Sequence, residues 1–411
     1  MGTIFLDNRK NVKDRSPTKV LIVATISHIM QHIYVGSSVL LPLIVAELNL
    51  NYTEFGLAIA ISSLAGGLSQ ILFSAASRKI ARNILLGLGN ILLSLGTFIT
   101  GLSHRLIDFL GARLISNIGV APQHPMGTAI ISEKFDEKSL GRAIGFHYGL
   151  AYIGNIAGPA IMTLLAATLG WRLTLFIFSI PALIIGVIVI WYLSEPKIKA
   201  GGESKGEKKR SLKSDVAALI KTRSVLFILA LQSLLSGGAD IGILTTYIPL
   251  FLADFLKMDI YERGVIYTLG LLGGVIGPIL LGNYGGKIGY IKVSFLSALS
   301  ASILVSLLAF YKQQFSIHLL TLHLFLLMFT GFSLTTLLQS QLVKVTYGYS
   351  RDLAVGAFFT IGFVFGSLWT GLIGCLIDCF SSFKPAFILM GMMELVASAM
   401  FVTKIKGGAS W

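Results

Sequence analysis

Long apolar runs alternate with short polar stretches along almost the whole chain. A helix needs about 20 mostly apolar residues to cross the hydrocarbon core of a bilayer. Twelve such runs can be traced, at residues 20–47, 55–76, 84–103, 106–131, 140–168, 172–193, 224–253, 261–282, 290–310, 315–342, 351–376 and 383–403. The pattern predicts an all-α polytopic membrane protein with twelve transmembrane helices. The first run starts too late and is too long for a cleaved signal peptide, so it is expected to be a retained span.

One long charged stretch interrupts this pattern in the middle of the chain. Residues Glu195–Asp215 are rich in Lys, Gly and Ser and fall between the sixth and seventh runs. Such a composition is typical of a flexible linker. The expected organisation is a cytoplasmic N-terminal tail, a six-helix bundle, a cytoplasmic basic linker, a second six-helix bundle and a cytoplasmic C-terminal tail, at residues 1–19, 20–194, 195–223, 224–403 and 404–411.

The two halves of the chain look like copies of each other. A shift of 208 residues without gaps aligns small and charged residues in several spans, placing Glu54 on Glu262, Gly66 on Gly274, Gly154 on Gly362 and Gly158 on Gly366. Two parallel repeats of six spans, with a site between them near the middle of the membrane, are an architecture of transporters. The sequence therefore predicts two six-helix pseudo-repeats.

Composition and charge agree with a membrane protein and give its orientation. Of the 411 residues, 54% are hydrophobic and 13% charged, against roughly a quarter charged in soluble proteins. The net charge of +14 is unevenly distributed: 26 of the 33 Lys and Arg residues lie on the side of the two termini. By the positive-inside rule, both termini are expected in the cytoplasm of a prokaryotic cell, with the protein in its plasma membrane. The basic excess is thus a topology signal and does not indicate nucleic-acid binding.

The fifth run contains unusually many small residues. Gly145 and Gly149 form one GxxxG pair, Gly154 and Gly158 form a second, and Pro159 follows. Small residues let helices approach closely inside a bilayer. The two pairs point to opposite sides of the helix, so two neighbouring helices can pack closely against this span. These five residues are candidates for a gating surface, with static packing as the alternative.

Several motifs together resemble those of the major facilitator superfamily. The run Gly154–Pro159 resembles its fifth-helix motif, which is commonest in proton antiporters, and Arg113–Ala121 resembles the fourth-helix pattern R-x-x-Q-G-x-G-x-A. Leu169–Pro181 is similar to the opening of its sixth helix. The loop Ser74–Asn83 resembles the signature G-x-x-x-D-R-x-G-R-R, although Arg78 stands in place of its Asp. The stretches SHIMQHIYVGSSVLLPLI and PQHP further resemble the fosmidomycin-resistance-like branch of exporters.

Polar residues inside the predicted spans are the candidates for the site. Ionisable side chains at bilayer depth are unfavourable and usually face a cavity or a partner. The resemblance implies that spans one, four, seven and ten line the cavity. The expected substrate-binding side chains are Gln31, His32, Tyr34, Arg113, Asn117, His124, Tyr148, Asn155, Ser236, Tyr247 and Gln339, with Thr335 beside the last of these.

Some of these groups can also carry a proton. Histidine changes its charge near neutral pH, so His28 and His32 are proton-coupling candidates, together with Arg113 and the acidic Asp240. The alternative for each histidine is a hydrogen-bonded structural role, and for Arg113 an ion pair within its own half. Glu394 is expected to be peripheral, because span twelve does not line the cavity of the resembled fold.

The functional prediction is a secondary active transporter that moves a small solute by alternating access. The phosphate-binding loop G-x-x-x-x-G-K-[ST] is absent from the sequence, so a solute or ion gradient is expected to drive transport. The resemblance favours proton-coupled export by antiport, and the alternative is proton-coupled uptake or exchange of a small organic anion. A transporter-like membrane sensor is the alternative of another class, and an enzyme is not expected.

The expected partners follow from these inferences. They are the lipid bilayer, protons and a small solute that is anionic or amphipathic, with one chain acting as a monomer. No cofactor is expected. No metal site is expected either, because Cys375 and Cys379 offer too few ligands.

Overall fold

The computed structural model describes residues 16–77, 79–135, 143, 146–193, 217, 219–346 and 351–406. These residues form helices and connecting turns and contain no strand. Nine of their helices are long and apolar enough to cross a membrane, and two shorter apolar helices lie at Arg223–Leu235 and Ile241–Phe255. The predicted all-α polytopic membrane fold is confirmed.

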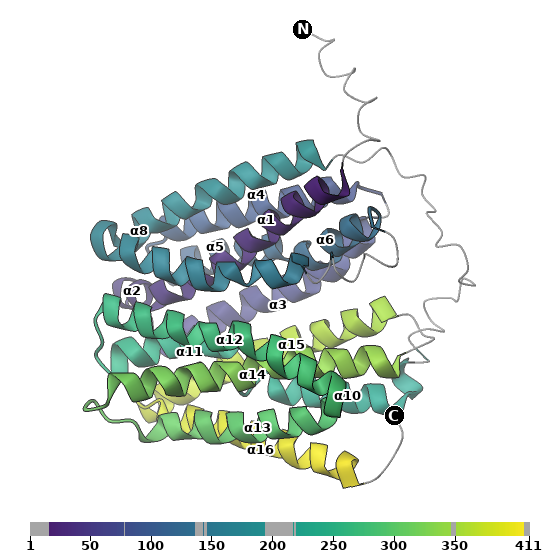
Figure 1. The fold of residues 1–411 in the computed structure, drawn as a ribbon. Helices are drawn as coiled ribbons and strands as arrows, with labels where there is room; N and C mark the ends of the chain where they lie inside the picture. The colour runs from purple at the N-terminus through teal and green to yellow at the C-terminus, as the bar shows by residue number, and fades with distance from the viewer. Residues whose placement is uncertain are drawn as a thin grey trace. The chain divides into compact units, whose positions relative to one another are not determined.

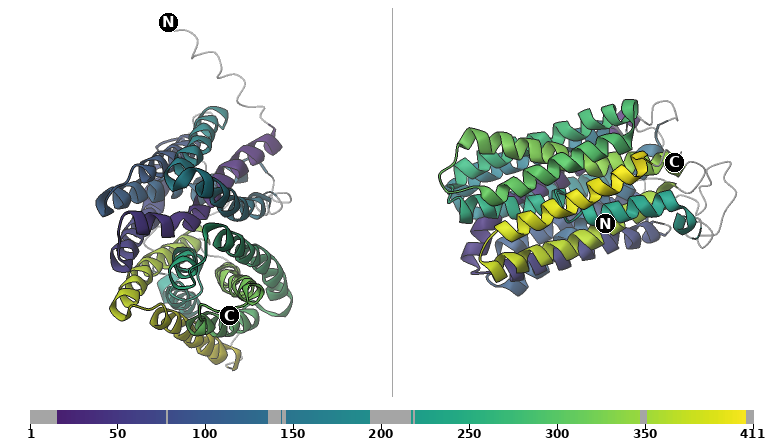
Figure 2. Two further views of the ribbon diagram at one scale, coloured as in Figure 1. Left: turned by 90° about the vertical axis from the view of Figure 1, so that its left-hand side faces the viewer. Right: turned by 90° about the horizontal axis from the view of Figure 1, so that it is seen from below.

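The described chain divides into two compact units (Figures 1 and 2). The first comprises residues 1–37, 65–158 and 169–207, and the second comprises residues 38–64, 159–168 and 208–411. The second unit thus contains parts of the first, second and fifth predicted spans together with the C-terminal half. The last change of unit along the chain, between residues 207 and 208, falls within the predicted linker.

The first unit is built from helices of the N-terminal half. They are α1 (Pro17–Val35), α4 (Arg82–Gly101), α5 (Leu106–Val120), α6 (Gln123–Ser132), most of α8 (Ile153–Tyr192) and the end of α3 (Tyr52–Ala76). The predicted fourth span is divided between α5 and α6 around Pro122, whose ring removes a backbone donor. Within α8 the chain reverses at Gly170, where φ is 76°, so this element contains both the fifth and the sixth predicted spans.

The second unit holds the remaining helices. They are η3 (Gly36–Leu40), α2 (Leu41–Glu47), α10 (Arg223–Leu235), α11 (Ile241–Leu250), η4 (Phe251–Phe255), α12 (Ile260–Ile288), α13 (Tyr290–Leu307), η5 (Leu308–Phe310), α14 (Ile317–Val345), α15 (Arg351–Phe380) and α16 (Lys384–Lys406). Helix α12 packs along α14, and α13 packs along α16 (Figures 1 and 2). The predicted seventh span is interrupted between α10 and α11, at a sequence that contains Gly237 and Gly238.

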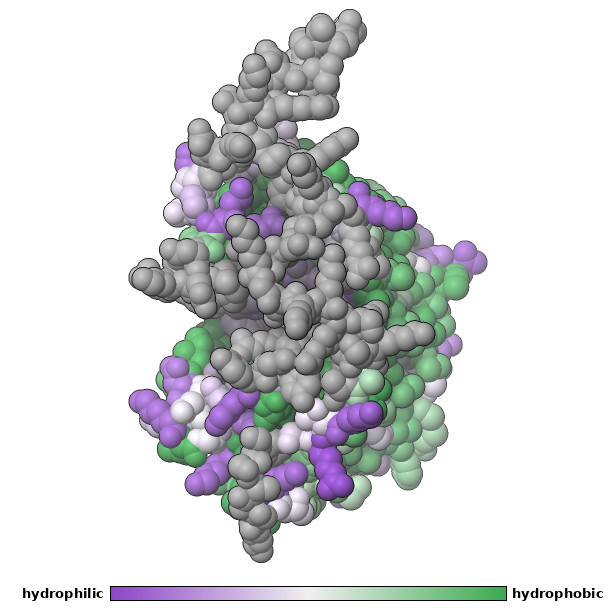
Figure 3. Space-filling model, turned by 90° about the vertical axis from the view of Figure 1, so that its right-hand side faces the viewer, coloured by the Kyte–Doolittle hydropathy of each residue, from purple (hydrophilic) through white to green (hydrophobic). Residues whose placement is uncertain are grey.

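The surface has the distribution expected of a bilayer protein. Large apolar side chains are exposed along the helices, with Leu72 68%, Leu164 60% and Leu368 61% exposed. Figure 3 shows hydrophilic residues at one end of the helices and hydrophobic residues along the adjoining flank. In a membrane these apolar side chains would contact lipid tails.

Several predictions fall outside the described residues. They concern Gly145, Arg78, most of the basic linker 195–223, most of the tail 1–19 and most of the tail 404–411.

Candidate functional site

Four histidines gather in the interior of the first unit. His28 of α1 is fully buried, and its ring centroid lies 4.9 Å from that of His32, 5.1 Å from that of His124 and 4.6 Å from that of His147. His124 belongs to α6, and His147 lies in the helical residues that precede α8. Three separate segments therefore bring four imidazoles around one point, which we call the histidine cluster.

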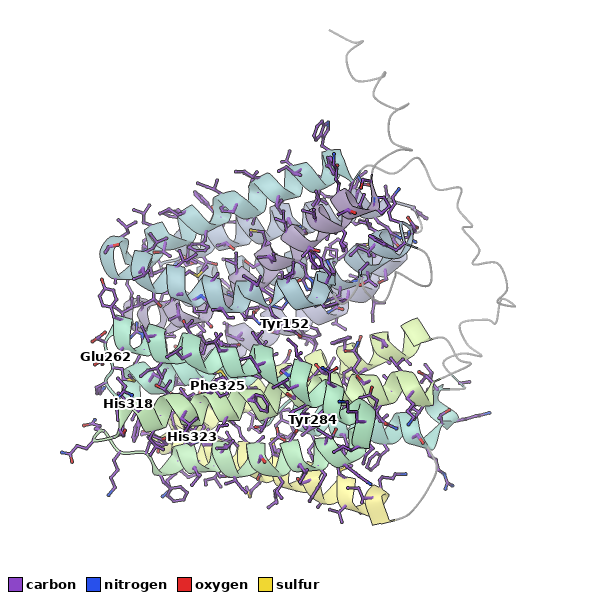
Figure 4. The ribbon with its side chains drawn as sticks, in the orientation of Figure 1. Tyr152, Glu262, Tyr284, His318, His323 and Phe325 are labelled. Carbon is purple, nitrogen blue, oxygen red and sulfur yellow. The ribbon has the colours of Figure 1, made fainter. Side chains whose placement is uncertain are left out.

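Aromatic rings complete the cluster on one side. The Tyr148 ring stacks on that of His124 with a centroid distance of 5.8 Å and lies edge-on to that of His28 at 5.1 Å. Tyr152, labelled in Figure 4, lies 5.3 Å from the His32 ring. The hydroxyl groups of Thr128 and Tyr148 are 3.1 Å apart. The expected site residues His32, His124 and Tyr148 are thus brought together.

A hydrogen-bonded chain fixes which nitrogens of the histidines carry protons. Asn155 Oδ1 lies 2.9 Å from His32 Nδ1, and an amide oxygen can only accept a hydrogen bond. His32 therefore donates through Nδ1, which leaves its Nε2 to accept from His28 Nε2 at 3.3 Å. In the neutral cluster, His28 Nδ1 is then the unprotonated nitrogen. This atom is buried and has no hydrogen-bond partner, so a proton can be added there while the other two hydrogen bonds persist.

A shell of neutral polar side chains holds the cluster in place. Thr25 Oγ1 lies 3.2 Å from His147 Nδ1. Ser27 donates to Gln123 Oε1 at 2.8 Å and accepts from Asn90 Nδ2 at 2.8 Å. These contacts tie α1 to α4, α6 and the residues before α8. The shell supplies no negative charge, so a proton bound in the cluster would leave it cationic.

Arg113 provides a permanent positive charge in the same unit. Its guanidinium carbon lies 4.9 Å from the centre of the Tyr34 ring, and its buried Nε has no hydrogen-bond partner. In the described part of the chain, the salt bridges are Arg82–Glu133 and Arg105–Asp108, and Arg113 takes part in neither. The structure therefore does not show the ion pair within its own half that was the alternative interpretation of Arg113.

Further polar atoms lie unpaired on α1, the helix whose Tyr34 ring contacts Arg113. Gln31 Oε1 and the Tyr34 hydroxyl are buried without hydrogen-bond partners, and both residues belong to α1, as His28 and His32 do. Asn117 lies one turn after Arg113 on α5 and donates to the Arg113 carbonyl oxygen at 3.1 Å. Unpaired buried polar groups are rare in native proteins and indicate an ordered water, an ion or a functional role.

The candidates of the second unit form a different and more acidic arrangement. Asp240 directly precedes α11, and its Oδ1 accepts from Gly242 N at 2.9 Å. Its Oδ2 lies 3.5 Å from Thr335 Oγ1 of α14. Ser236 donates back to the Ser233 carbonyl oxygen at 3.0 Å. Gln339 also lies on α14, one turn after Thr335.

Tyr247 has a contact that the sequence did not suggest. It was expected at the substrate site, but its side chain is 1% exposed and its hydroxyl donates to the Thr370 carbonyl oxygen at 2.5 Å. The hydroxyl is therefore engaged in the packing of α11 against α15.

Only part of the glycine-rich surface of the fifth span makes close helix contacts. A Cβ at Gly154 would lie 2.6 Å from the Ile29 carbonyl oxygen and 2.7 Å from His32 Cβ. At Gly158 it would lie 2.8 Å from the Ile33 carbonyl oxygen, whereas at Gly149 it would meet no atom within 4 Å. The pair Gly154 and Gly158 therefore holds α8 directly against the histidine-bearing stretch of α1. Pro159 follows at the start of a segment that belongs to the second unit.

A second polar group ties helix ends together within the second unit. The carboxylate of Asp378, at the end of α15, accepts the backbone N–H groups of Tyr52 and Thr53 at 3.0 and 2.5 Å. The Tyr52 hydroxyl donates to Asp254 at 2.7 Å. A carboxylate at the first turn of a helix is stabilised by the helix dipole, so Asp378 fixes the start of α3.

The second unit also has an apolar groove, which does not contribute to the polar site. An apolar groove of about 600 Å³ lies between α12 and α14, where His318 and Phe325 are among its lining residues (Figure 4). Among the described residues, no group of three or more His, Cys, Asp and Glu has the geometry to hold a metal ion. The histidine cluster is therefore interpreted as a titratable cluster.

The comparisons with known proteins agree with this fold. The model of the Major Facilitator Superfamily matches residues 21–370, so the chain belongs to this superfamily of transporters. The probable L-galactonate transporter of Escherichia coli is 23% identical over 388 residues, covering 88% of this chain and 83% of the relative. The sialic acid transporter NanX of the same organism is 24% identical over 324 residues, covering 79% and 78%.

A solved structure supports the same fold at lower sequence identity. A mutant form of the nucleoside transporter NupG superposes with a TM-score of 0.79 at 14% identity, covering 93% of this chain and 99% of that chain. The chain is thus similar throughout to membrane transporters of small solutes.

Proposed function

We propose that this protein is a proton-coupled secondary transporter that moves a small organic anion by alternating access. The observation that carries the proposal is Arg113, a permanent charge with a buried, unpaired Nε and no carboxylate partner among the described residues. An uncompensated charge inside a membrane protein is strongly unfavourable. A bound carboxylate would supply the missing counter-charge, and the planar guanidinium matches the geometry of a carboxylate.

The names of several relatives support an anionic substrate. Beside the L-galactonate and sialic acid transporters, they include a hexuronate transporter, a probable sulfoacetate transporter and a cis,cis-muconate transport protein. Each of these names specifies an acid. A hydroxylated acid would also use the neutral polar groups beside Arg113, such as Gln31, Tyr34 and Asn117.

The histidine cluster is proposed as the place where the coupling proton binds. His28 Nδ1 can take up a proton without loss of the hydrogen bonds that join His28, His32 and Asn155. A second proton on a neighbouring imidazole would be repelled by the first. The added positive charge attracts an anion, so the affinity for the anion should rise as the pH falls and His28 becomes protonated.

Direction and membrane orientation belong to the proposal as well. A protonated carrier that binds an anion favours uptake or exchange of the anion. Both termini are proposed to lie in the cytoplasm of a bacterial cell, and one chain is proposed to be the working unit. The asymmetric distribution of Lys and Arg supports this orientation. Alternating access would move the two bundles against each other, while Gly154 and Gly158 hold α8 against α1 within the first unit.

Export by proton antiport is a second candidate. The span-five motif and its contact with α1 favour it, and Multidrug resistance protein 1 of Bacillus subtilis is among the relatives. Membership of the fosmidomycin-resistance-like branch would fit this candidate. In that case protons would move inward as the solute moves outward, whereas in uptake the solute and the proton would move inward together.

Transport by purified protein in liposomes tests the proposal. Matched pairs of a sugar acid and its neutral sugar would be offered with and without an imposed pH gradient, acidic on the side of the solute. We expect the acid to accumulate in response to the gradient, the neutral sugar not to accumulate, and a protonophore to abolish the effect. An acid flux of the same size with and without the pH gradient would contradict proton coupling. Binding of the acid without any flux would indicate a sensor.

A further inference from the structure

Two acidic residues, Asp240 and Glu394, lie at the interruption between α10 and α11. Helix α10 ends at Leu235 and α11 begins at Ile241. Between them, Gly237 N and Gly238 N bond to carbonyl oxygens three residues back, at 3.0 Å each. The next amide, Ala239 N, donates to Glu394 Oε1 of α16 at 2.7 Å. The carboxyl group of Glu394 therefore replaces the helical acceptor that the interruption removes.

Glu394 is completely enclosed, contrary to the peripheral position expected from the sequence. Its exposed fraction is 0%, and a Cβ on Gly238 would collide with its Oε1, so glycine is required for the chain to approach it. Its other oxygen, Oε2, is buried without a hydrogen-bond partner. No cationic side chain in the described ranges forms a salt bridge with it. An ionised carboxylate with one donor and no counter-ion would be very unfavourable here, whereas the neutral acid is tolerated.

Asp240 lies directly after Ala239 and has a contrasting environment. Its Oδ1 accepts from Gly242 N at 2.9 Å at the start of α11, and Thr335 Oγ1 lies 3.5 Å from its Oδ2. Backbone donors and the positive end of a helix both stabilise a carboxylate. Asp240 is therefore better placed than Glu394 to carry a negative charge.

The two carboxyls affect each other electrostatically. Helix α16 packs against α10, α13 and α15, and the ionisable residue that directly follows the amide bound by Glu394 is Asp240. Two neighbouring carboxyls do not both ionise readily inside a protein. The geometry thus assigns one proton to the pair, and the unpaired Oε2 assigns that proton to Glu394.

We propose that Glu394, paired with Asp240, is a second proton-binding site, and that its protonation maintains the interruption between α10 and α11. The reaction is the reversible addition of one proton to the Glu394 carboxylate. Loss of the proton places two negative charges on adjacent sides of Ala239 and drives them apart, which changes the angle between α10 and α11. This site lies in the second unit and does not depend on anion binding at Arg113 or on the histidine cluster.

Infrared difference spectroscopy of the protein in liposomes, between acidic and alkaline buffers, tests this site without any solute. A protonated carboxylic acid has a carbonyl-stretch band that an ionised carboxylate lacks. We expect such a band in the wild type at neutral pH, and its loss in Glu394→Gln, which keeps an acceptor for Ala239 N. Asp378→Asn is the matched control and should keep the band, because the Asp378 carboxylate already accepts from two backbone N–H groups.

Two further measurements of the same band test the proposal even if Glu394→Gln fails to fold. In Asp240→Asn the neighbouring charge is removed, so the Glu394 band should disappear at a pH about one unit lower than in the wild type. Addition of Na⁺ at constant pH should leave the band unchanged. Absence of the band from the wild type at neutral pH, or its displacement by Na⁺, would overturn the proposal.

Discussion

Replacement of Arg113 by glutamine is expected to abolish binding and transport of the anion. Removal of one partner from a buried charge-assisted contact typically weakens binding by about 2–5 kcal/mol, which corresponds to a loss of affinity of roughly 30- to 3,000-fold. Arg113→Lys keeps the charge but loses the planar fork and its stacking over Tyr34, so an intermediate loss is expected. Equilibrium binding of a labelled sugar acid to purified protein measures both effects.

Arg105 is the matched control for this prediction. It belongs to the same unit, is 79% exposed and has its charge partner in Asp108. Arg105→Gln should therefore bind the anion as the wild type does. Unchanged affinity in Arg113→Gln would show that the anion is held elsewhere.

Replacement of Gly154 by leucine is expected to destabilise the protein so strongly that little folded protein is recovered. The new Cβ would lie 2.6 Å from the Ile29 carbonyl oxygen and 2.7 Å from His32 Cβ, and a backbone oxygen cannot move aside by a change of rotamer. Overpacking typically destabilises by about 1–3 kcal/mol and sometimes more, and the upper end of that range is expected here. The yield of monodisperse protein in detergent and its thermal unfolding temperature report the effect.

Gly149 separates this steric effect from the general effect of leucine in the same span. A Cβ at Gly149 meets no atom within 4 Å, and the residue is exposed. Gly149→Leu should therefore unfold at nearly the wild-type temperature. Equal losses in the two variants would mean that the contact between α8 and α1 does not stabilise the unit.

The spans could be predicted because hydrophobicity is a local property of the chain. About 20 apolar residues suffice to identify a membrane helix whatever its neighbours are. The interruptions were partly readable as well, since Pro122 and the pair Gly237 and Gly238 stand where the helices end. Their consequence, a carboxyl from α16 reaching the open backbone, depends on tertiary packing and could not be predicted.

The histidine cluster was only half predictable for a similar reason. His28 and His32 lie one turn apart on one helix, so their proximity follows from the helical period. The approach of His124 and His147 depends on how α6 and the residues before α8 pack against α1. Helices that are apolar on every side carry little information about which face turns inward.

The two units then differ in the chemistry that they provide. The first offers a permanent cation and a cluster of imidazoles, and the second offers two acidic residues, Glu394 and Asp240, at an interrupted helix. In the proposed mechanism, the anion neutralises the charge of Arg113. A proton gives the histidine cluster a positive charge, and a proton neutralises the Glu394 carboxylate.

Proton uptake on anion binding tests the coupling between Arg113 and the histidine cluster most directly. Purified protein in weakly buffered solution with a pH-indicator dye would receive the sugar acid that it transports, and the uptake would be compared with that of His28→Gln. Near neutral pH, the wild type should take up a proton with the anion, up to about one per anion bound, and His28→Gln should take up markedly less. Tight anion binding with no proton uptake at any pH between 5 and 8, the range in which histidine titrates, would contradict the proposed coupling.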